Sequence, residues 1–368
     1  MPCTGCPNAN FDRCDLTCGQ ATANPCADNL FLAAFMITLS PDAPLPHSLR
    51  GGVVAIGNFD GLHRGHQQLL AVAAAEAQRR NVCHGLLSFE PHPRSYFKPL
   101  EPVFRLTPLT LKARLAAALG MDFLAWLNFD EALAALEPEE FISRYLVEQL
   151  GVHHVVTGYD FHFGKGRKGG PETLKTMAQQ NGFDVTVVDQ VTDDGDGKAP
   201  YASSSIRSAL RRGNIRSAAR ELGYNWTVMG EVVHGDKRGR TIGFPTANII
   251  LEPGAEPFRG IYAVEVRDAT ASASVPHWQG AAYFGDRPTF NTKRTFLEVY
   301  LLDQDIDLYG QTLMVSFVDV VRGDKTFSSV AELVTQMNVD CSDVRRILSM
   351  PRTNEDSKLA QLQADGKI

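Results

Sequence analysis

The sequence lacks long apolar runs and long basic runs, and each absence excludes a class of partner. The longest apolar run near the start, Leu30 to Leu39, is shorter than the roughly 20 residues that cross a bilayer, and no basic segment precedes it. The formal net charge is −6 without a lysine-rich tail, which argues against nucleic acid as the main partner. We therefore expect a cytoplasmic protein that binds neither membrane nor nucleic acid. Its oligomeric state, a monomer or a weak homo-oligomer, is left open by the sequence.

Cysteine is scarce over most of the chain, because five of the seven cysteines lie in the first 26 residues. Cys3 and Cys6 form a C-x-x-C pair that could begin a zinc or iron–sulfur site, but no second pair follows and the count is odd. We expect residues 1–35 to be a disordered cysteine-rich extension. Two alternatives stay open: a metal site, or upstream codons read in frame before a start at Met36.

The length and the apolar pattern predict two domains, of which the first is an α/β domain. The chain has 368 residues, whereas one hydrophobic core usually supports no more than about 250–300 residues. In residues 51–190 short apolar runs alternate with segments of helical periodicity, which indicates a doubly wound, Rossmann-like parallel sheet with helices on both faces. The expected strands are Val53–Ile56, Val82–Phe89, Asp122–Leu127, Val155–Gly158 and Val185–Val188. The expected helices are Gln67–Arg80, Leu109–Leu119, Glu139–Leu150 and Glu172–Gln180.

The pattern changes after a polar loop at residues 193–197. Six short apolar runs without long helices between them predict a mainly antiparallel, six-stranded β-barrel: Thr227–Val233, Ala247–Leu251, Ile261–Val266, Gln279–Phe284, Phe296–Leu302 and Leu313–Val320. Two helices, Val330–Met337 and Val344–Ser349, are expected to follow. We therefore divide the chain into the extension (1–35), an α/β domain (36–205), a helical connector (206–223), a barrel domain (224–350) and a polar tail (351–368).

A motif that reads G-N-F-D-G-L-H-R-G-H, residues 57–66, directly follows the first expected strand. Ligands of open parallel sheets bind at the carboxyl ends of the strands, where the next helix offers free N–H groups and the positive end of its dipole. His63 and His66 are three residues apart, so both can face one ligand and stabilise charge on an α-phosphate during nucleotidyl transfer. Gly65 between them keeps the backbone approachable. A lone H-x-x-H pair is often only surface, but this position favours a nucleotide site.

A second group of polar residues lies in the barrel segment. Gly235 and Gly239 allow tight turns and close contact of the backbone with phosphate. Thr246 and Asn248 alternate on an extended stretch, so their oxygens point to one side and suit a Mg²⁺ ion shared with ATP phosphates. Glu298 lies between two apolar neighbours that face the other way, so it points to one side of its strand and can accept a proton. Taken alone, the pair of Thr246 and Asn248 is more often structural, and the alternative for Glu298 is a solvent-facing acid on a strand.

In both halves the motifs resemble those of the prokaryotic bifunctional riboflavin kinase/FMN adenylyltransferase (FAD synthetase) family. The resemblance covers about residues 45–345 and also rests on Ser88–Pro93, Arg105–Pro108, Gly158–Gly164 and an R-P-T run at 287–289. It implies phosphorylation of riboflavin to FMN by ATP, and then transfer of an adenylyl group from ATP to FMN, which gives FAD and pyrophosphate. Mg²⁺ would accompany ATP, and the flavins would be substrates and products.

The resemblance also implies a role for particular residues. The catalytic residues would be Glu298, as proton acceptor for the riboflavin hydroxyl, and His63 and His66. The ATP ligands would be Gly57, Asn58, Phe59, Asp60, Gly65, Ser203, Ser204 and Arg207 in the first domain, and Gly235, Gly239 and Arg240 in the second. The flavin contacts would be Phe89, His92, Asp160, Phe163, Phe244, Pro245 and Arg287. Thr246 and Asn248 would hold Mg²⁺.

Two segments depart from the family pattern. Where the family has S-S-T-x-I-R, this chain reads A-S-S-S-I-R over residues 202–207, although Arg207 still offers its planar guanidinium to phosphate. Tyr283 and Phe284 replace the usual residues before the R-P-T run. Two alternatives follow: an enzyme with one degenerate site, and a flavin-binding regulator without turnover, which would not need the transfer residues. A third interpretation, that the chain is a different H-x-G-H nucleotidyltransferase, does not explain the second domain.

Overall fold

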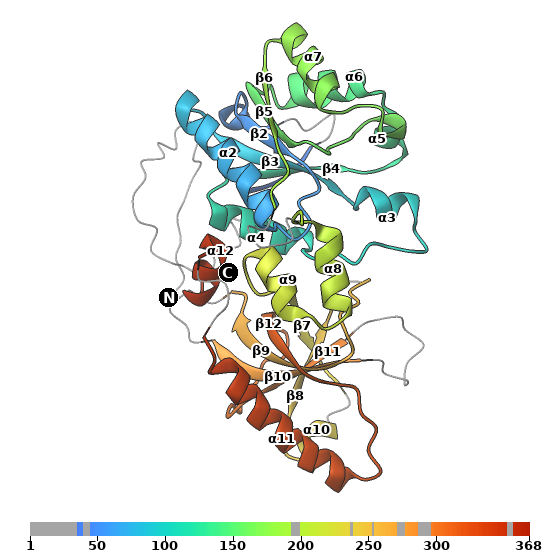
Figure 1. The fold of residues 1–368 in the computed structure, drawn as a ribbon, viewed down its shortest axis with the longest axis vertical. Coiled ribbons are helices and arrows are strands. Elements are labelled where there is room, and N and C mark those ends of the chain that lie inside the picture. Colours follow the sequence, from blue (N-terminus) through green and yellow to red (C-terminus); the bar gives the residue numbers. More distant parts are fainter. Residues whose placement is uncertain are drawn as a thin grey trace, which may run out of the picture.

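The computed structural model describes residues 35–39, 45–192, 199–235, 238–251, 254–270, 277–285, 296–351 and 356–368. Our expectations for residues 1–34, for the polar loop at 193–197 and for Arg287 lie outside the described residues. The sheet of the first domain lies at one end of the molecule and the barrel at the other, with helices between them (Figure 1).

Six parallel strands form the sheet of the first domain, in the order β1-β4-β3-β2-β5-β6. They are β1 (Met36–Leu39), β2 (Val53–Ile56), β3 (His84–Glu90), β4 (Phe123–Asn128), β5 (His154–Gly158) and β6 (Asp184–Val188). Five of them were expected; β1, a four-residue strand at the sheet edge that ends the apolar run Leu30–Leu39, was not. The chain continues from β2 to β3 on one side and from β5 to β6 on the other. Strand order therefore reverses between β2 and β5, where such sheets bind ligands.

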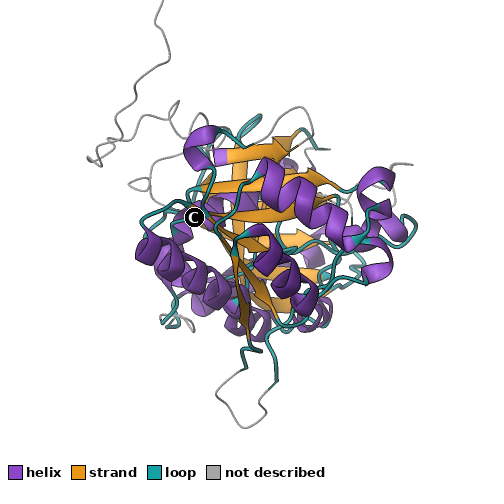
Figure 2. Cartoon of the chain, turned by 90° about the horizontal axis from the view of Figure 1, so that it is seen from above, coloured by secondary structure: helices purple, strands orange, loops and turns teal. Residues whose placement is uncertain are grey.

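Both faces of this sheet are buried, which confirms the doubly wound class. Along β2, Val53 and Ala55 belong to one hydrophobic cluster and Val54 and Ile56 to another, as the alternation of side chains in a strand requires. Helices surround the strands (Figure 2). They are α2 (Arg64–Arg80), α3 (Pro93–Phe97), α4 (Leu109–Leu119), α5 (Glu131–Ala135), α6 (Pro138–Phe141), a π-helical turn (Ile142–Gln149) and α7 (Pro171–Asn181), with 3-10 turns at His47–Leu49 and Lys165–Arg167.

The second domain is a closed antiparallel barrel with the strand order β10-β11-β8-β7-β12-β9, as the sequence predicted. Its strands are β7 (Thr227–Val233), β8 (Thr246–Ile250), β9 (Gly260–Asp268), β10 (Trp278–Phe284), β11 (Phe296–Leu301) and β12 (Thr312–Gly323). The short helix α10 (Arg238–Thr241) lies between β7 and β8 in the chain.

One continuous helix, α11 (Val330–Leu348), packs along the barrel where we expected two separate helices. Polar residues between the two expected helices have partners in the folded chain. Asp340 is 3% exposed, and its carboxylate accepts two hydrogen bonds from Arg322, at 2.9 and 2.8 Å. Cys341 and Val344 are buried against the barrel. Tertiary contacts therefore override the local pattern and keep the helix intact.

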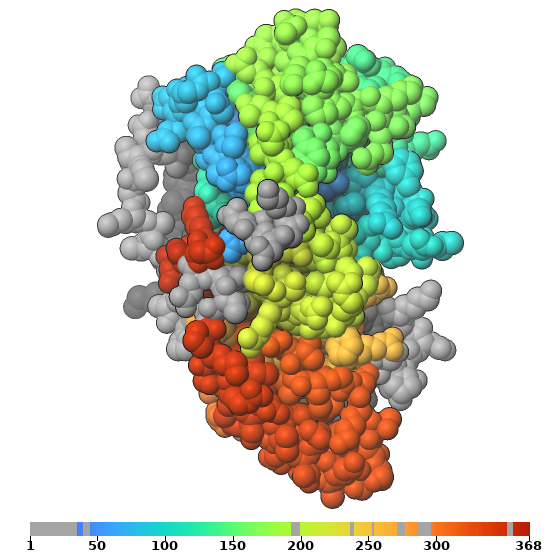
Figure 3. All heavy atoms as spheres, viewed as in Figure 1, coloured from blue at the N-terminus to red at the C-terminus, as the bar shows by residue number. Residues whose placement is uncertain are grey.

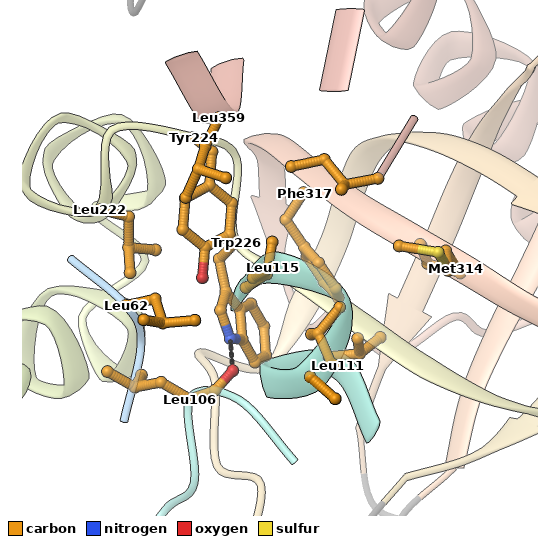
Figure 4. Close-up of a cluster of buried hydrophobic side chains, with 14 of the residues drawn as sticks. Leu62, Leu106, Leu111, Leu115, Leu222, Tyr224, Trp226, Met314, Phe317 and Leu359 are labelled. Atoms are coloured by element: carbon orange, nitrogen blue, oxygen red, sulfur yellow. Dashed lines mark hydrogen bonds between the residues drawn. The ribbon is translucent and has the colours of Figure 1, made fainter. Parts of the chain in front are cut away.

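Three helices occupy the region where the two domains meet: α8 (Ser203–Arg211), α9 (Ile215–Leu222) and α12 (Lys358–Ala364) (Figures 1 and 3). The helix α12 lies in the segment that we treated as a polar tail, yet Leu359 in it is fully buried. Leu359 belongs to a hydrophobic cluster that both domains supply (Figure 4). In that cluster the indole N–H of Trp226 donates to the carbonyl oxygen of Leu106 at 3.1 Å.

Candidate active sites

The loop after β2 lies where the strand order reverses, and Asp60 is its central residue. The buried carboxylate of Asp60 accepts hydrogen bonds from the backbone N–H groups of Leu106 and Thr107, both at 3.0 Å, and from the guanidinium of Arg207 at 2.5 Å. Burial alone would raise the pKa of Asp60, but Arg207, Lys112 and the two N–H groups hold it below its ordinary value. Asp60 therefore stays ionised and joins the loop to α8.

His63 and His66 lie together at the start of α2, as the sequence predicted. Their imidazole rings stack with centroids 3.7 Å apart, and His63 caps the helix by accepting from the backbone N–H of His66. Burial is the main cause that lowers the pKa of both rings, to about 4 for His63. Both rings are therefore neutral at pH 7, so each keeps one N–H donor. Among the described residues nothing bonds to the buried Nδ1 of His66, which leaves this nitrogen for a ligand.

The buried His63 should make the folded chain sensitive to acid. Between pH 6.5 and about pH 4 the unfolded chain binds a proton at His63 and the folded chain does not, so stability decreases as the pH falls. We expect this residue alone to lower the free energy of unfolding by about 2 kcal/mol between pH 7 and pH 5. Urea unfolding of the wild type and of His63→Gln at both pH values checks this, because the variant should lose less stability. Equal losses would contradict the assignment.

Lys112 is a residue of this site that the sequence analysis missed. Its side chain is 4% exposed, and its ammonium donates to the carbonyl oxygen of Asn58 at 2.7 Å and to the hydroxyl of Ser88 at 3.1 Å. A buried lysine is rare, and this one brings a positive charge to the loop after β2. In the sequence, Lys112 is one cation within an otherwise ordinary helix, and nothing marks it.

The A-S-S-S-I-R run forms the start of α8, directly beside the loop. The hydroxyl of Ser203 donates to the carbonyl oxygen of Asp60 at 2.8 Å, whereas Ser204 is exposed. Ala202 at the N-cap offers no side-chain bond, so the first N–H groups of the helix lack a side-chain cap. Arg207 donates to Asp60 and to the carbonyl oxygen of Phe104, so part of the guanidinium that we expected on phosphate is used within the protein.

The expected flavin residues of the first domain lie in and beside an aromatic cluster. Phe89 and Phe163 are nearly buried, and both contact Phe141, with ring centroids 6.2 and 5.3 Å apart. His92 caps α3 by accepting from the N–H of Arg94, and burial lowers its pKa to about 4. Asp160 is exposed. The two phenylalanines are therefore part of the core as well as candidates for the wall of a flavin pocket.

In the barrel, strand register brings the expected transfer residues together. Glu298 of β11 is directly opposite Asn248 of β8 on one side and Tyr283 of β10 on the other. In the adjacent row of the same face, Thr246 is opposite Tyr300. Directly opposite residues in an antiparallel sheet have neighbouring side chains on one face. The barrel therefore carries a threonine, an amide and a carboxylate on one patch of this face, in which the Asn248 side chain is buried.

A cavity of about 390 Å³ lies over this patch, a volume in the range of small-molecule sites. Strands, α11 and the segment between them line it with Thr246, Glu298, Tyr283, Phe244, Phe327 and Met337, among others. Arg240 and Pro245 line a neighbouring hollow, which Thr246 also borders. At Gly235 an added Cβ would lie 2.3 Å from the side-chain amide nitrogen of Asn248, so a larger residue there would displace the Asn248 side chain.

Two sites of this kind on one chain define a class of enzyme, a two-domain transferase of phosphorus-containing groups. Residues 45–199 match the family model for FAD synthetase, and residues 222–348 match the model for riboflavin kinase. The bifunctional riboflavin kinase/FMN adenylyltransferase of Escherichia coli (strain K12) is 38% identical over 302 residues, which cover 82% of this chain and 94% of that protein. The chain belongs to the bifunctional riboflavin kinase/FMN adenylyltransferase family.

Other related proteins match this chain over a similar share of its length. The protein of that family from Bacillus subtilis (strain 168) is 36% identical over 304 residues, covering 81% of this chain and 92% of that protein. A crystal structure from Streptococcus pneumoniae, of a protein named a macrolide-efflux protein, is 30% identical with a TM-score of 0.73, and covers 84% of this chain and 99% of that chain. In the part of the chain that the structure describes, no helix has the length and apolar character of a membrane span.

Proposed function

We propose that the barrel phosphorylates riboflavin with ATP and that the α/β domain transfers an adenylyl group from ATP to FMN. The observation that carries the proposal is the register of β8, β10 and β11, which sets Glu298 beside Asn248 and Tyr283. A carboxylate in this place can act as the general base, because the hydroxyl of riboflavin must lose a proton as it attacks the γ-phosphate. A flavin-binding regulator would have no use for it.

The adenylyl transfer makes a different demand. The phosphate of FMN is already an anion with a second pKa near about 6, so it needs no strong base. The site must instead stabilise charge that develops on the α-phosphate of ATP. The neutral rings of His63 and His66 supply N–H donors, and the start of α8 adds free backbone N–H groups beside Asp60. Each transfer is then a direct attack, without a covalent intermediate on the protein.

Mg²⁺ is the metal that these residues fit. Thr246 and Asn248 provide hard oxygen donors on one face, and Mg²⁺ bound to ATP needs only one or two protein ligands. The described residues contain no group of three or more His, Cys, Asp and Glu side chains suited to a metal ion, so the proposal rests on Thr246 and Asn248 together with the phosphates of ATP. Bound there, Mg²⁺ would neutralise phosphate charge.

Removal of the metal should stop both reactions. We expect less than about 1% of the FMN and FAD formation to remain with excess EDTA, and full recovery when Mg²⁺ is restored, because metal and phosphate charge are coupled in the transfer step. Timed chromatography of the flavins measures both products. Undiminished FMN formation in EDTA would contradict a role for Thr246 and Asn248 as metal ligands.

The proposed function is tested by incubating the pure protein with riboflavin, ATP and Mg²⁺ and separating the flavins over time. If FMN appears first and FAD follows, both activities are established. FMN alone would show that the replaced phosphate run, with Ala202 at its start, has disabled adenylyl transfer. No product from riboflavin or from added FMN, with flavin bound, would favour the regulator. Since ATP is the co-substrate, we place the reactions in the cytoplasm, with riboflavin, FMN and ATP as the partners.

A further inference from the structure

The nucleotide loop after β2 has an unusual backbone. Phe59 has a φ of 48°, Gly61 of 90° and Leu62 of 39°, so three residues within four are in the left-handed region. Side chains such as Phe and Leu rarely adopt this region, because it brings the Cβ atom close to the backbone and strains the chain. A loop with this conformation persists only when contacts from outside the loop hold it.

Gly61 receives two of these contacts, one at each end of the residue. Its N–H donates to the hydroxyl of Thr107 at 2.8 Å, and its carbonyl oxygen accepts from the hydroxyl of Tyr224, also at 2.8 Å. Tyr224 is 1% exposed. Burial raises the pKa of Tyr224 far above its ordinary value, so the hydroxyl keeps the proton that it donates. Gly61 lies two residues before His63, the cap of α2.

Tyr224 comes from outside the part of the chain that matches FAD synthetase, since it lies in the riboflavin kinase match. The segment that carries it is held in turn by α12. The side-chain amide of Gln363 accepts from the backbone N–H of Asn225 at 2.9 Å and donates to its carbonyl oxygen at 3.1 Å, and also to the hydroxyl of Thr227 at 3.0 Å. Leu359 of α12 and Tyr224 belong to the same hydrophobic cluster (Figure 4).

We propose that Tyr224 is a positioning residue for adenylyl transfer, because its hydroxyl fixes the carbonyl of Gly61 and thereby the loop that sets the imidazoles of His63 and His66. The inference rests on the proposed adenylyltransferase function. It means that a residue of the kinase half completes the active site of the other half. Without the hydroxyl, the Gly61 carbonyl would be left buried and unpaired, and the strained loop would relax away from the geometry that ATP needs.

The variant Tyr224→Phe removes one oxygen atom and keeps the ring in the core. We expect kcat/KM for ATP in FAD formation from FMN to fall about five- to tenfold, the size of one buried hydrogen bond. Riboflavin phosphorylation by the same preparation should be unchanged. A merely structural loss would reduce the amount of folded protein and so lower both activities together, without a change in KM for either reaction.

Tyr262→Phe is the matched control. Tyr262 is equally buried, and its hydroxyl also donates to a backbone carbonyl, that of Phe258, but both of these residues belong to the barrel domain. A selective fall in FAD formation for Tyr224→Phe alone would support the inference. Unchanged FAD formation in Tyr224→Phe, or an equal fall in both variants, would overturn it. A wild type that forms no FAD from FMN would overturn the proposed function itself, and the inference with it.

Discussion

Replacing Glu298 by glutamine should stop the phosphorylation of riboflavin and leave the conversion of FMN to FAD intact. The glutamine keeps the size of the side chain and its place opposite Asn248 and Tyr283, but it cannot accept a proton. General base catalysis contributes about 10²–10⁴-fold, so we expect kcat for FMN formation to fall by at least about a hundredfold. Chromatography of the products from riboflavin, and separately from added FMN, measures the two activities in one preparation.

Glu231→Gln is the control for this experiment. Glu231 is an exposed carboxylate on β7 of the same barrel and does not line the cavity that contains Glu298. The control should keep both activities, which would show that the loss follows from the position of the carboxylate and not from charge alone. If Glu298→Gln phosphorylated riboflavin as fast as the wild type, Glu298 would not be the proton acceptor.

Replacing His66 by alanine should affect the other activity. We expect FAD formation to be lost and FMN formation to be retained. The pair of stacked rings at the start of α2 supplies donors to charge that exists only in the transition state. Loss of one such donor costs about 10²–10³-fold in kcat, and we expect that range for FAD formation from FMN. The KM for FMN should change much less, since the ring acts on the phosphate of ATP. Steady-state rates with saturating ATP measure this difference.

His84→Ala serves as the control here. His84 begins β3, at the amino end of the sheet, and its ring pairs with Asp122 at 2.9 Å, away from the carboxyl ends where the nucleotide loop lies. Both activities should survive in this variant. FAD formation by His66→Ala at the rate of the wild type would refute the role of His66, and a loss in the control of the same size would show that the α/β domain simply tolerates substitution poorly.

The sequence predicted those parts of the fold that local periodicity determines. Short apolar runs predicted five strands of the parallel sheet and all six of the barrel. Strands that are buried on one or both faces need apolar residues at regular positions, and this pattern is visible in the sequence. The failures occurred where contacts with other elements decide the outcome. Two helices were expected where the single helix α11 forms, and Arg322 of β12 pairs with Asp340 in the segment between them.

The same distinction applies to the candidate sites: features set by local spacing were predicted, and features set by distant residues were not. The histidine pair is local, so its geometry followed from a spacing of three residues. The approach of Glu298 to Asn248 depends on the pairing of strands about fifty residues apart, which no spacing shows. Arg207 was expected on ATP, yet its guanidinium also reaches back 147 residues to Asp60. Lys112 and Tyr224 were missed because each acts on the nucleotide loop from an element distant in sequence.

The hydrophobic cluster between the domains limits how this polypeptide can be divided. The two family matches leave a gap between residues 199 and 222, but α8 and α9 fill that gap with Leu210 and Ile215, members of the same cluster as residues of both domains. A gene cut there would give two products, each with a broad apolar face that the other normally covers. Such faces drive association or aggregation. Two genes for the separate halves would therefore have to be expressed together, and fusion into one reading frame guarantees equal amounts of both.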